Sequence, residues 1–311
     1  MCNLLSKVIT VSIRQDLDRI TTPDQIGLRE LYNIFYSVPD FEIPIVRYSI
    51  YPGSSLIRQR VNKKRESFKN IAEIYYPPAS VTPMERANLP GNPMFYACSF
   101  PSEITDQSPI PRVIALEETS SFMRDTSQSG IERATVSRWN IIARIDLIAL
   151  PYIGTYNRAC PDLLRVKEKW EKTISQGVIP QDALELVNYM AEEISKDFSD
   201  RNQYFKIANF VHYLLKINQK TRDADGIIYP SVPAQGVGFN VAIKPESADA
   251  KIRFSNASEC HLLKKGMKMA VIPVSDAIVD EYGGMTFKDR NFTPEDMVFY
   301  FDNSIGLSFV N

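Results

Sequence analysis

The sequence predicts an α+β protein in which strands come first, helices follow, and further strands close the chain. Short apolar runs broken by proline, glycine and asparagine fill residues 41–123, which is typical of strands joined by turns. Between residues 163 and 217, apolar side chains recur three and four positions apart, as expected of amphipathic helices. Because strands and helices occupy separate stretches, the order does not fit a regular alternation of strand and helix.

The composition limits the class of protein. The chain has 311 residues, of which 44% are hydrophobic and 23% charged, so it can bury a sizeable core in one large domain or two smaller ones. The 36 basic and 37 acidic residues give a net charge of -1, which argues against a general nucleic-acid-binding protein. No apolar run approaches the roughly 18–20 residues of a membrane span.

The amino-terminal residues and the cysteines both indicate a protein of a reducing compartment. The first residues lack the layout of a secretory signal, so we expect a cytoplasmic protein. Cys2, Cys98, Cys160 and Cys260 are widely scattered and form no C-x-x-C pair. We therefore expect reduced thiols and no zinc site.

The first part of the chain, residues 1–40, predicts a helical extension. Thr22 is expected as the N-cap, Pro23 at the first helical position, and Gln25 as the partner in a capping box. Residues 26–38 then place apolar side chains along one helical face. The rest of the chain is assigned to one domain.

That domain, residues 41–311, begins with predicted strands. The four apolar runs are residues 45–51, 55–61, 93–99 and 111–116. After Glu117 the pattern switches to a short helix that ends near Phe122. Residues 135–150 predict either a buried strand or a helix that leads into a strand, and periodicity does not separate the two.

Helices and then strands follow. Helices are expected over residues 163–174, 181–198 and 204–217, and strands over 227–229, 237–243, 267–274 and 297–301. The segment from about 124 to 223 is thus predicted to be a helical insertion into the domain. Gly236-Val237-Gly238 is not a dinucleotide fingerprint, because the third glycine and the following helix are missing.

Several polar residues stand at the edges of these elements. Arg58 and Arg60 lie two apart on a predicted strand, so their side chains would share a face. The arginine fork suits phosphate groups because it donates two parallel hydrogen bonds. Arg86 and Asn88 open a polar loop before a strand that carries Tyr96, whose ring can stack and whose hydroxyl can donate.

Four segments, in this order, resemble the motifs of the RES-domain family, which is named for its Arg, Glu and Ser. Ile57 stands where the family has an aromatic residue, and the resemblance covers about residues 44–243. The four segments are Ile57-Arg58-Gln59-Arg60, then Tyr76-Pro77-Pro78 with Arg86-Ala87-Asn88 through Tyr96, then Ala115-Leu116-Glu117-Glu118, and finally Asp225-Gly226-Ile227-Ile228-Tyr229-Pro230-Ser231 with Asn240.

The resemblance implies a fold, an activity and a site. The fold is an ADP-ribosyltransferase-like split sheet, and the activity is breakdown of NAD+ by phosphorolysis or hydrolysis, as in toxins that an antitoxin protein restrains. NAD+ is then the substrate, inorganic phosphate a candidate co-substrate, and no cofactor or metal is needed. The implied catalytic residues are Arg58, Glu118 and Ser231. The implied binding residues are Arg60, Arg86, Asn88, Tyr96, Tyr229 and Asn240.

Alternatives stay open at this level. Arg60 competes with Arg58 for the first motif position, and Glu117 competes with Glu118 for the third. The same scaffold could transfer ADP-ribose to a macromolecule, or the chain could be a non-catalytic interaction protein. The inserted helices would serve equally as a dimer surface for a homo-oligomer, a lid, or an antitoxin docking face.

Overall fold

The computed structural model describes residues 12–62, 66–99, 111–125, 127–150, 160–196, 200–233, 236, 238–266 and 268–291. The strands are β1 Val46–Ile50, β2 Ser55–Val61, β3 Phe95–Ser99, β4 Ser129–Ile141, β5 Ile145–Ala149, β6 Gly226–Pro230, β7 Phe239–Ile243, β8 Ile252–Lys265, β9 Lys268–Val279 and β10 Met285–Asp289. They form one ten-stranded mixed sheet in the order β1-β5-β6-β7-β3-β2-β4-β8-β9-β10. The predicted α+β class is confirmed.

The helices range in length from four residues in α4 to 16 in α5. They are α1 Ile13–Arg19, α2 Gln25–Ser37, α3 Pro111–Thr119, α4 Ser121–Arg124, α5 Pro161–Gln176, α6 Gln181–Ile194, α7 Phe205–His212 and α8 Pro245–Lys251. A π-helical turn, Tyr213–Ile217, continues α7, and short 3₁₀ turns cover Ile71–Ile74, Ala79–Val81 and Arg201–Tyr204. None of the helices in the described ranges is long and apolar enough to cross a lipid bilayer.

The sheet has a narrow junction in its middle. Strand β2 pairs with β4 along its whole length, from Ser55 to Val61. Its pairing with β3 is limited to Leu56 opposite Ser99 and Ile57 opposite Cys98. The two halves of the sheet, β1-β5-β6-β7-β3 and β2-β4-β8-β9-β10, are thus joined by two residue pairs, and the β2–β3 ladder ends at Ile57.

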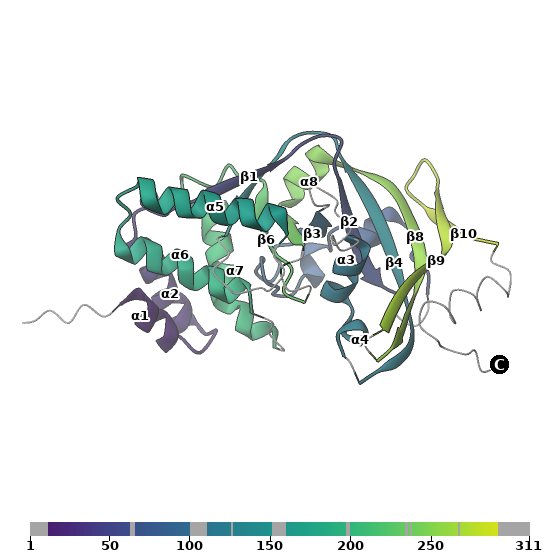
Figure 1. Cartoon of the computed structure of the whole chain (residues 1–311), viewed down its shortest axis with the longest axis horizontal. Helices are drawn as coiled ribbons and strands as arrows, with labels where there is room; N and C mark the ends of the chain where they lie inside the picture. Colours follow the sequence, from purple (N-terminus) through teal and green to yellow (C-terminus); the bar gives the residue numbers. More distant parts are fainter. Residues whose placement is uncertain are drawn as a thin grey trace, which may run out of the picture.

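A group of helices lies at one end of the molecule, beside β1 (left in Figure 1): α1, α2, α5, α6 and α7. Helix α1 packs on α2 and α6, α6 on α7, and α5 on β1. The ring of Phe35 lies 5.4 Å from that of Phe210 and 5.3 Å from that of Tyr213. The amino-terminal helices therefore share one hydrophobic core with the helices that follow β5.

Helix α3 packs across the junction of the two halves of the sheet, against β2 and β3. Ile114, Ala115 and Leu116 join a second buried cluster that includes Ile57 and Cys98. The prediction of a strand over residues 111–116 is wrong. A short apolar run has no periodicity that distinguishes a strand from a buried helix, and the proline at the start of α3 is compatible with the first helical turn.

Two other predictions are corrected. Helix α2 begins at Gln25 with Asp24 as its N-cap, whose carboxylate accepts a hydrogen bond from Gly27 N–H at 2.8 Å, while Thr22 donates to Asp24. Aspartate is the stronger N-cap, so it takes that position. The segment 124–223 is not wholly helical, because it contains β4 and β5 of the central sheet. Residues 135–150 therefore belong to two strands, and not to a helix that leads into a strand. The predicted strand at 297–301 lies outside the described residues.

Candidate active site

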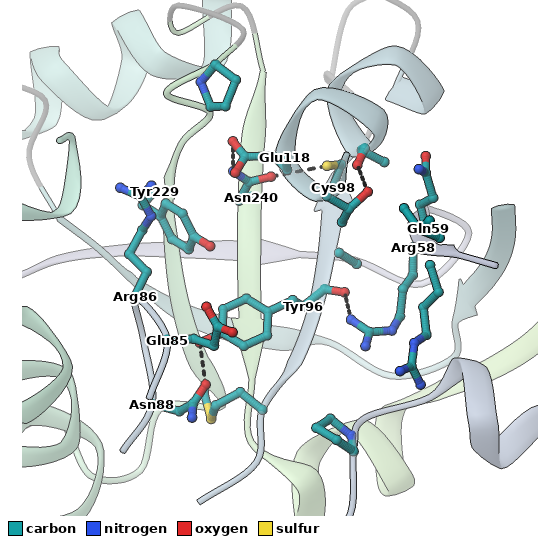
Figure 2. A pocket seen from close by; sticks show the side chains of 18 of the residues that line it. Arg58, Gln59, Glu85, Arg86, Asn88, Tyr96, Cys98, Glu118, Tyr229 and Asn240 are labelled. Carbon is teal, nitrogen blue, oxygen red and sulfur yellow. Dashed lines mark hydrogen bonds between the residues drawn. The ribbon is translucent and has the colours of Figure 1, made fainter. Parts of the chain in front are cut away.

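A cavity of about 600 Å³ lies where β2 separates from β3 (Figure 2). Strands β2 and β3, helix α3, the loop before β3 and the β6–β7 pair all contribute to its wall. Apart from Ser231, the predicted site residues line this cavity: Arg58, Arg60, Arg86, Asn88, Tyr96, Glu118, Tyr229 and Asn240. Tertiary structure thus brings together residues from well-separated parts of the chain.

The Glu118 carboxylate is held by two buried neighbours. Ser231 donates from Oγ to Glu118 Oε1 at 2.6 Å, and Asn240 donates from Nδ2 to the same oxygen at 2.7 Å. The Asn240 Oδ1 in turn accepts a hydrogen bond from the Cys98 thiol at 3.1 Å. Both described bonds end on Oε1, so the carboxylate has a set orientation, and none of the described hydrogen bonds engages its second oxygen, Oε2.

The local structure explains why these groups meet. Asn240 is the register partner of both Cys98 and Tyr229, so the three side chains share one face of the sheet. Ile114 and Glu118 are four residues apart on α3 and therefore share a helix face. At Gly238 a Cβ atom would lie 2.1 Å from Ile114 Cδ1. The glycine thus permits the close approach of α3 that brings Glu118 to β7.

Ser231 has a different position from the other predicted residues. It follows β6 directly and is fully buried, with 0% of its surface exposed. Its hydroxyl donates to Glu118, so it orients the carboxylate. Of the two rival glutamates, Glu118 is the one in this hydrogen-bond network; the side chain of Glu117 lies outside the described residues.

The predicted arginines are bonded to backbone carbonyls. Arg58 donates from Nε to Ile74 O at 3.1 Å and from Nη1 to Tyr96 O at 2.5 Å. The second bond crosses the β2–β3 junction beyond the end of the ladder. Arg60 donates to the carbonyl of Glu73. Both arginines line the cavity, so Arg58 and Arg60 fit the first motif position equally well.

Arg86 is anchored in the same way. It donates to the carbonyls of Ile194 and of Lys196, the latter at 2.7 Å. Its guanidinium lies 5.2 Å from the ring of Tyr204 and 6.0 Å from the ring of Tyr229. These contacts are with a helix end and aromatic rings, so they fix the side chain without neutralising its charge.

The cavity is electrically positive. Among the described residues it is lined by five arginines and two glutamates. One of the glutamates, Glu85, forms an ion pair with Arg201 at 3.0 Å. None of the described ion pairs involves Arg58, Arg60 or Arg86. Burial, together with the charge of Arg60, lowers the pKa of Arg58 to about 10. The guanidinium therefore stays protonated at neutral pH, and the cavity attracts anions.

Asn88 and Tyr96 stabilise the wall. The Tyr96 hydroxyl donates to Asn88 Oδ1 at 2.7 Å and accepts from the Ala87 N–H at 3.1 Å. Asn88 Nδ2 donates to the carbonyl of Pro83 at 2.8 Å. Both polar groups are thus engaged within the loop before β3, and burial raises the pKa of the Tyr96 phenol. Their described contacts thus hold the loop before β3 against β3.

Some cavity residues were missed by sequence reasoning. Arg201 and Tyr204 come from the segment that the sequence assigns to the helical insertion, and nothing in their local pattern connects them with the motifs. Gln59 stands between the two predicted arginines on β2. Because side chains alternate between the two faces of a strand, its side chain could have been predicted to lie on the face opposite the arginines. Within the described residues, no cluster of histidine, cysteine, aspartate and glutamate could hold a metal ion.

No protein-family model matches the chain, and a comparison with curated proteins gives no match.

Proposed function

We propose that this protein breaks the bond between nicotinamide and ribose in NAD+, with inorganic phosphate or water as the acceptor. The observation that carries the proposal is the Glu118 carboxylate, oriented by Ser231 and Asn240 inside a cavity whose other charges are mainly arginines. One directed carboxylate beside several cations suits a ligand that has a reacting sugar and a pyrophosphate.

The chemistry requires a stabilised cation and a held sugar. Cleavage expels neutral nicotinamide and leaves a ribose with oxocarbenium character. A carboxylate next to that carbon stabilises the developing charge and can accept a hydrogen bond from a ribose hydroxyl. Because Ser231 and Asn240 both bond to Oε1, the other oxygen of Glu118 is the one assigned to the substrate.

The arginines are assigned to the phosphates. Arg58 and Arg86 use part of their donor capacity on carbonyls, and a guanidinium has five N–H donors. The remaining donors and the uncompensated charge favour the pyrophosphate of NAD+ or an incoming phosphate ion. A cavity of about 600 Å³ is within the usual range of roughly 300–1,000 Å³ for small-molecule sites.

The proposal includes the fold and the biological setting that the RES-domain resemblance implies. The four motif segments converge on one cavity, and the sheet narrows to two residue pairs between β2 and β3; both observations support an ADP-ribosyltransferase-like core. An enzyme that destroys NAD+ needs restraint in the cell that makes it. We therefore include an antitoxin protein as the proposed partner.

The test is NAD+ consumption by the purified protein, with and without inorganic phosphate, with products separated by chromatography. Nicotinamide with a phosphorylated ADP-ribose would establish phosphorolysis, and nicotinamide with free ADP-ribose would establish hydrolysis. If the folded protein neither binds nor consumes NAD+, the proposal is wrong. Binding without consumption would favour transfer to a macromolecular acceptor.

A further inference from the structure

Gln59 is a buried amide without a partner at the wall of the cavity. Only 3% of its surface is exposed, and neither Oε1 nor Nε2 has a hydrogen-bond partner within the described part of the chain. The residue nevertheless lines the cavity. Burying an amide without hydrogen bonds costs free energy, so buried polar side chains are nearly always paired, and an exception calls for an explanation.

The side chain lies on the α3 side of the sheet. Neighbouring residues of a strand point to opposite faces, so Gln59 shares a face with Ile57, which packs with Ala115 of α3. Arg58 takes the opposite face, and Figure 2 shows the two side chains leaving β2 in different directions. The amide therefore reaches the part of the cavity between β2 and α3, where Ala115 and Thr119 also line the wall.

The Thr119 hydroxyl, which also lines this wall on α3, is already engaged. Thr119 donates its hydroxyl to the carbonyl of Ala115 at 2.8 Å, within its own helix. Next to Gln59 on the same face, Ile57 is part of an apolar cluster. An apolar side chain of similar length would fill this place without the cost of an unpaired amide. The amide is therefore better explained by a ligand than by packing.

We propose that Gln59 determines specificity by making two hydrogen bonds to a planar donor–acceptor edge of the substrate. A glutamine amide donates from Nε2 and accepts at Oε1, so it is complementary to a primary amide or to an amino-substituted heterocycle. The inference rests on the proposed function, because NAD+ carries one such edge at each end, the nicotinamide carboxamide and the adenine amino edge.

The test compares Gln59→Met with its parent in the full-length Glu118→Gln protein, so that NAD+ is bound without being consumed. Methionine keeps the length of the side chain and removes both hydrogen-bonding groups. We expect the free protein to melt about 2–6 °C higher, because an unpaired buried amide is removed. The affinity for NAD+ should fall about tenfold to a hundredfold in calorimetry. Gln176→Met, at the exposed end of α5, is the matched control and should change neither quantity.

Two dinucleotide analogues identify the edge. One has unsubstituted purine in place of adenine, which removes the amino donor, and the other has an acetyl group in place of the carboxamide, which removes the amide donor. The penalty of Gln59→Met should disappear for the analogue that has lost the edge bound by Gln59. A penalty that persists with both analogues would contradict the role in specificity.

The outcomes separate this inference from the proposed function. If the wild type consumes NAD+ but Gln59→Met binds it as tightly as the parent, the inference alone is overturned. A lower melting temperature of Gln59→Met would also overturn it, because the amide would then have a partner in the free protein. If the wild type does not bind NAD+ at all, the proposed function and the inference are both rejected.

Discussion

Replacing Glu118 by glutamine removes the charge of the carboxylate and keeps its shape. The glutamine Oε1 can still accept the hydrogen bonds that Ser231 and Asn240 donate at 2.6 and 2.7 Å. Each bond changes from charge-assisted to neutral, which weakens it by about 1 kcal/mol. The free energy of unfolding should therefore fall by no more than about 2 kcal/mol.

Glu118→Ala is the informative contrast. It removes the acceptor of both bonds, so the buried Ser231 and Asn240, which are 0% and 4% exposed, each lose the hydrogen bond to Glu118. Removing one partner of a buried hydrogen bond costs about 1–3 kcal/mol, so this variant should lose about 2–6 kcal/mol of stability. Urea denaturation of the three proteins measures the difference. If glutamine destabilises as strongly as alanine, the hydrogen-bond network described for Glu118 is wrong.

The effect of Glu118→Gln on catalysis should be much larger than its effect on stability. Removing one group that stabilises developing charge in the transition state lowers kcat about 10²–10³-fold. The assay is NAD+ turnover at saturating substrate, followed by chromatography of nicotinamide. A folded Glu118→Gln protein that turns over NAD+ at the wild-type rate would refute the assignment of Glu118 as the catalytic carboxylate.

Three further predictions concern the groups around Glu118 and the response to pH. Ser231→Ala removes one of the two bonds to Glu118 and should lower NAD+ turnover about tenfold while leaving KM nearly unchanged, since Ser231 orients the carboxylate; a change confined to KM would contradict this. Arg58→Met should lower the affinity for NAD+ about tenfold in calorimetry, whereas Arg47→Met, whose guanidinium is paired with Asp223 at 2.7 Å, should not. The free energy of unfolding should fall as pH rises above about 10, because phenols with raised pKa values stay protonated in the folded protein while those of the unfolded chain ionise. Cationic groups with lowered pKa values act in the opposite direction but are fewer; they are Arg58, whose pKa is about 10, and Arg60, Lys206, Lys220 and Lys244. Urea titrations across this range, with tyrosinate absorbance, provide the check. Exposed tyrosines such as Tyr282 ionise in the folded protein, but absorbance that reaches its full value before unfolding would contradict the raised pKa values of the buried phenols. The tyrosines with raised pKa values include Tyr48, Tyr75, Tyr96, Tyr189, Tyr213 and Tyr229.

Local sequence was sufficient for elements whose pattern is long or clearly bounded. Strand β2 was predicted over its full extent, and α5 and α6 were predicted to within a few residues. The spacing of their apolar residues shows which side of the element meets the core, and this spacing can be read within one short stretch of sequence. Helix α3 was mistaken for a strand, and strand β8 was not predicted, because α3 is short and because β8 is defined by its pairing with β4 and β9.

For the candidate site, too, the sequence determined one part and the tertiary structure another. The sequence alone determined which residue types are available and in which order: Arg58, Glu118, Ser231 and Asn240 are all present at motif positions. Only the tertiary structure decided that Ser231 and Asn240 share one oxygen of Glu118, and that Arg58 bonds to the Tyr96 carbonyl. Residues more than a hundred positions apart meet through strand register and helix packing. These depend on pairing across the whole sheet, which no local pattern contains.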